Sequence, residues 1–500
     1  MTELLVLLLV LVPVSAGLGA WFASARLAGR FAALGGITAL AAGFSLAWRV
    51  FNEGTQLGFG GLVVVDALGA YILVLVLVVS AIALAGSPGH LAHELAAGML
   101  RPHDTGRYYA LLLWFAIGLA AVPLVDNLGL VWVGIEATTI VSALLVGFSR
   151  TPEAIEAAWK YLILGSIGIG FALLGTLLVY ASSVGVLGAS SDALNWTRLM
   201  GLGPQLDPGL VRLAFIFALA GYGTKAGLAP FHTWLPDAHS QAPSPISALL
   251  SGAGLAVAMY ALARFHLVSS AALGPALSST LLVAIGLLSL AVALPFIVAQ
   301  TDLKRLLAYS SIEHLGLTAL ALGFGGPLAL LGLTLHLVSH GFAKATVFLA
   351  AGQLVAERRS RRIGRLGGSL ARSPTEARAL VVATLALAGL PPSGIFIAEL
   401  AILFGGVQAG WGLAASVAAV LLAFTVAGLL FHVVRIATGP AGPAGNFESG
   451  GPAALRRPEF ARVLLLGTPL TLVVVAGLWT PSPLAATMAQ VVAILSGGHG

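Results

Sequence analysis

The sequence predicts an all-α, polytopic membrane protein, and three observations support this fold class. The 500 residues are 58% hydrophobic and 9% charged, with a mean hydropathy of +0.99, whereas soluble proteins carry about 25% charged residues. Apolar runs long enough to cross about 30 Å of hydrocarbon recur along the whole chain. They do not show the alternating segments of roughly ten residues that are typical of membrane barrel strands.

These runs predict about fourteen membrane-spanning helices. Glu3 stands where a secretory signal would carry positive charge, so we interpret the first run as a retained helix. The predicted windows are residues 2–22, 31–50, 62–86, 108–125, 128–149, 161–183, 210–229, 243–267, 276–299, 303–325, 327–355, 377–406, 412–436 and 460–480.

The basic residues predict the orientation of these helices. Nineteen of the 25 Lys and Arg residues fall in loops on one side of the membrane, and only Arg49, Arg198, Arg212 and Arg264 fall in loops on the other. Because basic loops stay in the cytoplasm, both termini should lie on the outer, periplasmic side of a bacterial-type cytoplasmic (inner) membrane. The most basic run, residues 357–378, is interpreted as a topology anchor at the lipid headgroups or as a docking site for a cytoplasmic partner.

The chain contains no cysteine. This excludes disulfides, cysteine-ligated iron–sulfur clusters and thiolate zinc sites. Neither a GxxxxGK[ST] phosphate loop nor an HExxH motif occurs. We therefore expect no cofactor, no metal site and no redox chemistry in this chain itself.

Several ionisable side chains remain inside apolar spans. A central charge costs about 2.5–3.5 kcal/mol to insert, so five unpaired charges would cost on the order of 15 kcal/mol, more than a typical fold stability. They should therefore be paired, neutral or facing water, and an ion or proton path is their usual role. The formally charged residues are Glu136, Lys225, Glu313, Lys344 and Glu399, and the histidines are His314, His336 and His340.

The run HLVSHGFAKATVFLAAG (336–352) places three of these groups on one helix face. His336, His340 and Lys344 are spaced four residues apart, so they stack over about 12 Å. Histidine titrates near neutrality and passes a proton between its two nitrogens. The pattern predicts a proton relay, and hydrogen bonding between packed helices is the alternative.

Two of the predicted helices are interrupted. Gly221, Gly223, Gly227 and Pro230 surround Lys225 in the seventh, and the twelfth breaks between Gly389 and Gly394, at Pro391 and Pro392. A broken helix is tolerated in a membrane only where it is buried in protein or lines a cavity. A packing kink is the alternative interpretation of each break.

The breaks lie five helices apart, which predicts two inverted five-helix repeats. The repeats would be residues 107–268 (helices 4–8) and 269–436 (helices 9–13). Residues 1–106 would hold helices 1–3, and residues 437–500 a Gly/Pro-rich cytoplasmic loop, helix 14 and the C-terminal tail. By this layout Glu136 is the acid nearest Lys225, and such a pair is strongly coupled in a low dielectric.

Three stretches resemble the antiporter-like proton-conducting membrane transporter family: TKAGLAPFHTWLPDAHSQAPSPISALLSG (224–252), LAYSSIEHLGLTALALG (307–323) and the run from His336. That family includes large membrane-arm subunits of respiratory complex I, their relatives in hydrogenase-4 and formate hydrogenlyase complexes, and Mrp-type antiporters. The resemblance covers about residues 62–436. Residues 134–164, GIEATTIVSALLVGFSRTPEAIEAAWKYLIL, are most similar to the hydrogenase-4 component F type.

The resemblance implies roles for single residues. Glu136 matches a helix-5 glutamate that pairs with the helix-7 lysine, Lys225. His336, His340 and Lys344 match the helix-11 relay, and Glu399 matches the helix-12 exit residue. His232 and Asp237 lie in the helix 7–8 signature, where structural support and proton transfer are both open.

Two departures from the family pattern stand out. Helix 8 carries no lysine or histidine before Arg264, so Ser251 and water would have to bridge Lys225 to His336. Glu313 stands where many relatives have a small polar residue, and it either adds a site or pairs with His314.

The resemblance implies a proton-translocating subunit of a redox-driven complex, either hydrogenase-4/formate hydrogenlyase-like or NADH:quinone oxidoreductase-like. Its partners would be other membrane-arm subunits and a peripheral iron–sulfur or nickel–iron module, with no nucleic acid. One alternative is a subunit of an Mrp-type Na⁺/H⁺ antiporter. Another is a non-conducting structural anchor, which the missing helix-8 residue favours.

Overall fold

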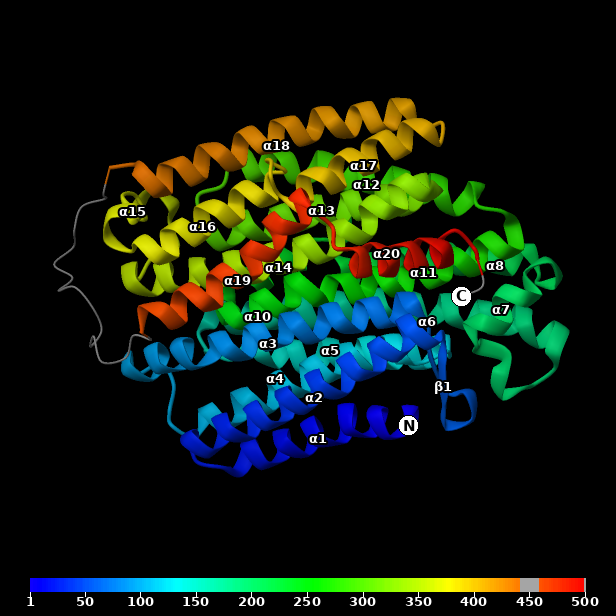
Figure 1. The fold of residues 1–500 in the computed structure, drawn as a ribbon, viewed down its shortest axis with the longest axis horizontal. Coiled ribbons are helices and arrows are strands. Elements are labelled where there is room, and N and C mark those ends of the chain that lie inside the picture. Colours follow the sequence, from blue (N-terminus) through cyan, green and yellow to red (C-terminus); the bar gives the residue numbers. More distant parts are fainter. Residues whose placement is uncertain (441–457, 499–500) are drawn as a thin grey trace.

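The structure is a computed structural model that describes residues 1–440 and 458–498, and it is built almost entirely of helices that run side by side (Figure 1). Twelve helical segments in the described residues are long and apolar enough to cross a membrane. They are α1 (Thr2–Phe22), α2 (Ala25–Glu53), α3 (Ala67–Ala96), α4 (Asp104–Ala121) with η2 (Val122–Leu124), α5 (Leu128–Val146), α6 (Pro152–Leu187), α10 to α11 (Ser244–Leu273), α12 (Ala276–Val298), α13 (Leu303–Phe324), α14 (Gly326–Arg358), α18 (Gly412–Thr438) and α19 (Glu459–Leu478). The predicted all-α membrane fold is confirmed.

The seventh and twelfth predicted helices are each divided in two. The seventh consists of α8 (Pro208–Ala226) and α9 (Trp234–Gln241), and the twelfth of α16 (Pro374–Leu387) and α17 (Gly394–Gln408). The connecting residues, 227–233 and 388–393, contain the cis peptide bonds Ala229–Pro230 and Pro391–Pro392. Gly221 and Gly223 lie inside α8 and not in the break. A Cβ at Gly221 would lie 2.4 Å from the Ala172 backbone nitrogen, so this glycine permits close packing on α6.

The remaining elements are short. The hairpin of β1 (Gln56–Gly58) and β2 (Val63–Val65) pairs Gln56 with Val65 and precedes α3. The short helices are α7 (Trp196–Leu202), α10 (Ser244–Leu249) and α15 (Ser369–Arg372). The π-helical segment η5 (Leu250–Gly254) joins α10 to the longer α11 (Leu255–Leu273). The 3₁₀ turns are η1 (Phe59–Gly61), η3 (Ser191–Leu194), η4 (Gly203–Gln205) and η6 (Ile363–Arg365).

Helix α20 (Ser482–Leu495) lies where the sequence predicted a tail. It is too short to cross a bilayer, since about 20 residues are needed. Instead it packs against α3 and α14 and buries Met488, Val491 and Leu495. The N-terminus and α20 lie at the same end of the bundle (Figure 1). The predicted Gly/Pro-rich loop falls mostly within residues 441–457, outside the described residues.

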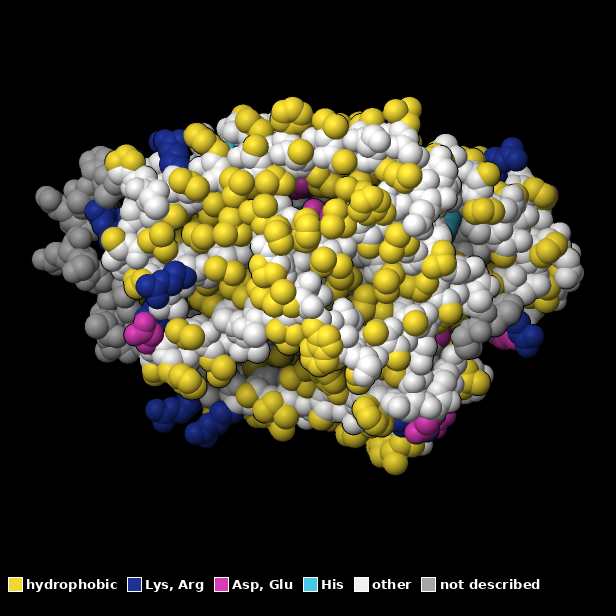
Figure 2. Space-filling model, turned by 45° about the horizontal axis from the view of Figure 1, so that its top comes forward, with side chains coloured by type: hydrophobic (Ala, Val, Ile, Leu, Met, Phe, Trp, Pro, Cys, Tyr) yellow, Lys and Arg dark blue, Asp and Glu magenta, His cyan; other side chains and the backbone are white. Residues whose placement is uncertain are grey.

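Helix α14 lies in the interior, where it contacts α3, α10, α13, α16, α17, α19 and α20. The apolar window of the α10–α11 span is completely buried. Large apolar side chains are exposed on the outside, including Ile167, Phe424 and Phe431, and Figure 2 shows an apolar face with Lys and Arg gathered towards its two ends. Polar groups on α10, α13 and α14 are therefore shielded from lipid.

Candidate functional site

The first part of the site surrounds Lys225, in the last turn of α8. This lysine is 1% exposed. Its Nζ donates to Thr139 Oγ1 on α5 (2.8 Å) and to the Tyr161 hydroxyl on α6 (2.6 Å). The Tyr161 hydroxyl also lies 2.7 Å from Ser142 Oγ, and its ring stacks on Trp234 at 4.4 Å. Neutral hydroxyls from two helices therefore solvate the buried amine.

The break in helix 7 positions this lysine. Gly227 ends α8 in the left-handed region at φ +75°, and its N–H returns to the carbonyls of Gly223 and Thr224, a common glycine cap. The Trp234 indole donates to the Thr224 carbonyl at 2.8 Å. These bonds satisfy carbonyls that the helix end leaves free.

Glu136 lies one turn before Thr139 on α5. Its Oε1 accepts a hydrogen bond from Ser166 Oγ on α6 at 2.7 Å, and its buried Oε2 has no partner among the described residues. Glu136 acts on Lys225 electrostatically, but the lysine makes its direct contacts with Thr139 and Tyr161. The pair expected from the sequence is therefore coupled through space and is not a contact ion pair.

The second part of the site is a cluster of three histidines. His336 and His340 of α14 lie on one face, as their spacing predicted, and both are buried. His314 of α13 packs against both, with ring centroids 5.1 Å from His336 and 5.0 Å from His340. The ring nitrogens of His314 and His336, and Nε2 of His340, have no hydrogen-bond partner in the described part of the chain.

Lys344 continues this stripe and is fully buried. Its Nζ donates to the Leu307 carbonyl (2.8 Å) and to Ser310 Oγ (2.5 Å), both on α13. The next residue, Ser311, lies 2.9 Å from Ser251 Oγ. Ser251 thus reaches the lysine's surroundings through α13 and makes no hydrogen bond to His336 or Lys225. It lies in the π-helical segment η5, a distortion that is frequent at functional sites.

Two acidic side chains adjoin this cluster. Glu313 of α13 is buried, its Oε2 has no partner among the described residues, and it acts electrostatically on Lys344. Glu399 of α17 is partly exposed and lies against Gly389 in the second break, where a Cβ would be 2.0 Å from Glu399 Oε2. Figure 2 shows acidic atoms in the middle of the apolar face. The second break thus makes room for a carboxylate.

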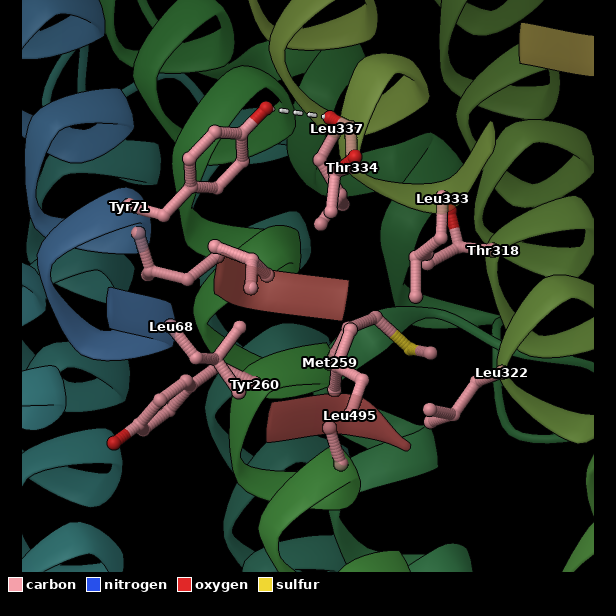
Figure 3. Close-up of a pocket in the computed structure, with 13 residues that line it drawn as sticks. Leu68, Tyr71, Met259, Tyr260, Thr318, Leu322, Leu333, Thr334, Leu337 and Leu495 are labelled. Atoms are coloured by element: carbon pink, nitrogen blue, oxygen red, sulfur yellow. Dashed lines mark hydrogen bonds between the residues drawn. The ribbon is translucent and has the colours of Figure 1, made fainter. Parts of the chain in front are cut away.

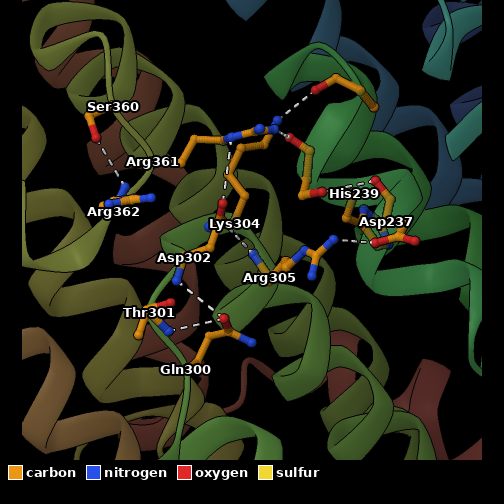
Figure 4. A network of polar contacts seen from close by, with 12 residues as sticks. Asp237, His239, Gln300, Thr301, Asp302, Lys304, Arg305, Ser360, Arg361 and Arg362 are labelled. Carbon is orange, nitrogen blue, oxygen red and sulfur yellow. Dashed lines mark hydrogen bonds and ion pairs between the residues drawn. The ribbon is translucent and has the colours of Figure 1, made fainter. Parts of the chain in front are cut away.

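The helix 7–8 signature residues lie towards one end of the bundle. Asp237 of α9 accepts a hydrogen bond from Arg305 Nη2 on α13 at 2.5 Å (Figure 4). It also accepts one from Lys160 Nζ on α6 at 3.1 Å, so it joins α9 to both helices. This geometry favours structural support. His232 lies on the break after α8, half-buried, and its Nδ1 has no partner among the described residues.

A buried ion pair was missed in the sequence. Arg264, expected in an outer-side loop, is 1% exposed in α11, and its Nη2 lies 2.6 Å from Asp66 Oδ1. Its guanidinium lies 3.8 Å from the ring centroid of Trp196. Nearby, burial raises the pKa of Asp126, and hydrogen bonds from Thr197 oppose that shift. Asp66 and Arg264 are 198 residues apart in the sequence. The only sequence signal for this pair was that each residue lies near the end of an apolar span.

An apolar cavity lies beside the histidine cluster, between α3, α11, α13, α14 and α20 (Figure 3). Leu333 and Leu337 of α14, the helix that carries His336, line it together with Leu495 of α20. The Tyr71 hydroxyl donates to the Thr334 carbonyl at 2.7 Å. One side of the histidine cluster therefore borders an apolar cavity.

Two broken helices and a core that contains buried Glu, Lys and His side chains are the features of an ion-translocating membrane protein. Residues 125–425 match the family model described as NADH:quinone oxidoreductase/Mrp antiporter, TM. The chain belongs to this family, as its signature stretches predicted.

Particular relatives narrow the comparison. The chain is 40% identical over 381 residues to the hydrogenase-4 component F homolog of Methylacidiphilum infernorum, covering 76% of this chain and 79% of that protein. It is 34% identical to NADH-quinone oxidoreductase subunit N of Desulforudis audaxviator, covering 73% and 70%.

Solved structures show the same fold. A chain of respiratory complex I from Thermus thermophilus matches with a TM-score of 0.74 and 26% identity, covering 96% of this chain and 97% of that one. A chain of the Mrp complex from Dietzia sp. matches with a TM-score of 0.82 and 22% identity, covering 99% and 97%.

Proposed function

We propose that this chain is a proton-translocating, antiporter-like subunit of a redox-driven membrane complex of the hydrogenase-4 or NADH:quinone oxidoreductase kind. The observation that carries the proposal is the cluster of His314, His336 and His340 with Lys344, buried in a core that excludes lipid. Ionisable groups are costly to insert into a membrane, and a cluster of them is characteristic of a proton pathway. The relatedness to the hydrogenase-4 component F homolog supports the redox-driven setting.

In this proposal Lys225 is the first proton carrier. The Thr139 and Tyr161 hydroxyls hold its ammonium form, and a negative Glu136 favours that form through space. When Glu136 is neutralised or displaced, Lys225 holds its proton less tightly and releases it. Thr139 and Tyr161 stay in place to accept hydrogen bonds from the ammonium when Lys225 takes up a proton again, so Glu136 and Lys225 act as a switch.

The released proton would move on through groups in the core. Ser251 and Ser311 offer hydroxyls beside Lys344, and water would have to join them to Lys225. The three imidazoles pass a proton between their nitrogens. Glu399, which is partly exposed beside Gly389, would then release it.

The distribution of basic residues and the known relatives support a membrane location and partner subunits for this chain. The protein would lie in a bacterial-type cytoplasmic membrane, with its basic loops in the cytoplasm and both termini outside. It would assemble with other membrane-arm subunits and with a peripheral redox module that holds the metal centres. Each of the two five-helix repeats would carry one of the broken helices.

The test is to purify the tagged chain in mild detergent, identify the proteins that accompany it by mass spectrometry, and measure proton pumping in inside-out vesicles. We expect iron–sulfur or nickel–iron subunits to co-purify and Lys225→Met to abolish pumping. Arg30→Met, which removes an exposed basic side chain of α2, is the control and should pump normally. Small antiporter subunits without a redox protein would instead indicate cation/proton antiport, and pumping by Lys225→Met would contradict the proposal.

A further inference from the structure

Among the buried ionisable residues outside this scheme, two lie on the helices that pack around Lys344. Lys304 begins α13 and His239 lies on α9, and both are buried (5% and 0% exposed). We propose that His239 and Lys304 form the cytoplasmic entry through which Lys344 is reprotonated. This inference rests on the proposed function and adds to it the residues that supply the histidine cluster.

His239 packs against α14, the helix that carries Lys344. Its ring stacks on Phe348, one turn beyond Lys344 on α14, with centroids 5.2 Å apart. Both Lys344 and Lys304 act on it electrostatically. Neither ring nitrogen has a hydrogen-bond partner in the residues that the structure describes, whereas buried polar atoms are generally paired. A histidine that is free at both nitrogens is suited to accept a proton on one and release it from the other.

Lys304 is held beside this histidine by the end of α9. Its Nζ donates to the Ala242 carbonyl at 2.6 Å. Asp302 caps α13 by accepting from the Lys304 and Arg305 backbone N–H groups, and Arg361 donates to the Ser240 carbonyl at 2.7 Å (Figure 4). These bonds fix the backbone around both residues but leave the His239 ring unbonded.

Groups near the end of α3 extend the series towards the basic end of the bundle. Lys304 acts electrostatically on His90 and on Glu94, and His93 acts on His90. His93 and Glu94 are half-buried, so this end of α3 has ionisable groups that reach the surface. In this proposal the proton passes from Glu94 and the α3 histidines to Lys304, and then to His239 and Lys344.

The transfer itself involves only protons. The Lys304 ammonium gives a proton to one nitrogen of neutral His239, the imidazolium releases the proton on its other nitrogen, and the neutral Lys344 amine takes it. Lys304 then regains a proton from the Glu94 side. Two ammonium groups flanking His239 repel each other in a low dielectric, so a proton arriving at Lys304 favours onward transfer from Lys344.

The variant Lys304→Arg distinguishes a proton-transfer role of Lys304 from a purely structural one. Arginine keeps the positive charge and can donate to the Ala242 carbonyl, but it is not deprotonated in proteins. We expect Lys304→Arg and His239→Gln, in the whole complex, to assemble normally and to lower proton pumping in inside-out vesicles about tenfold or more, the scale of a lost proton-transfer group. Lys160→Arg, the same exchange at an exposed lysine, is the control.

The outcomes distinguish the two proposals. Wild-type pumping by Lys304→Arg would show that the lysine is structural and would overturn the entry. If Lys304→Arg pumps normally while Lys225→Met and Lys344→Met do not, the entry fails and the proposed function stands. If all three pump normally, the proposed function itself fails.

Discussion

Lys225 and Lys344 show how single side chains are accommodated in this core. Within the described residues, each ammonium is hydrogen-bonded to neutral oxygens and to no carboxylate: Thr139 and Tyr161 for Lys225, and Leu307 and Ser310 for Lys344. Glu136 and Glu313 act on these lysines through space and not by a direct hydrogen bond. A contact ion pair would hold the proton firmly, whereas this arrangement lets a change at the acid alter the lysine's proton affinity.

The Arg264–Asp66 pair is the opposite case, a contact pair that we expect to be structural. Arg264→Met would leave Asp66 charged and unpaired in the interior, which should destabilise the fold by about 3–5 kcal/mol. Thermal unfolding of the detergent-solubilised protein would measure the loss. Arg49→Met, which breaks the exposed pair with Glu53, should cost less than about 1 kcal/mol, and equal losses in the two variants would contradict this assignment.

At the scale of elements, the two broken helices place their charged residues in different ways. Lys225 precedes its break and points to α5 and α6, while Glu399 follows its break and lies back against Gly389. Helix α6 packs along α8, and α14 packs along α16 and α17. This shared packing supports two corresponding repeats, which remain a prediction.

Gly389 provides the test at this scale. It has φ +60°, and an added Cβ would meet the Glu399 carboxylate, so Gly389→Ala should displace that carboxylate and lower proton pumping. Gly410 has φ +87° and open space around it, so Gly410→Ala should show only the backbone cost of about 1–2 kcal/mol. Thermal unfolding and pumping, measured on both variants, separate the two effects, and equal pumping would contradict the role of Gly389.

For the whole molecule, the structure places the N-terminus and α20 at one end (Figure 1), and the charge bias predicts that this end faces outward. Alkaline phosphatase fused to the C-terminus should therefore be active, and green fluorescent protein fused there should be dark. Fusions after Ser360, in the basic loop, should behave in the opposite way. A fluorescent C-terminal fusion would contradict the predicted orientation, and would also place the proton entry on the opposite side.

The sequence by itself determined the fold class, the approximate spans, both proline breaks and the family. These follow from local signals: apolar run length, proline and glycine positions, and contiguous motifs. It also placed His336, His340 and Lys344 on one face, because helical periodicity is a local property.

Only the tertiary structure decided which groups meet. His314 joins the histidines of another helix, Tyr161 and Thr139 replace Glu136 as the contacts of Lys225, and Arg264 finds Asp66 across 198 residues. The burial of Lys304 and His239 arises in the same way, from the docking of α9 against α13 and α14. In a uniformly apolar chain, many helix pairings satisfy hydropathy equally well, so side-chain packing between helices selects the partners of each buried charge.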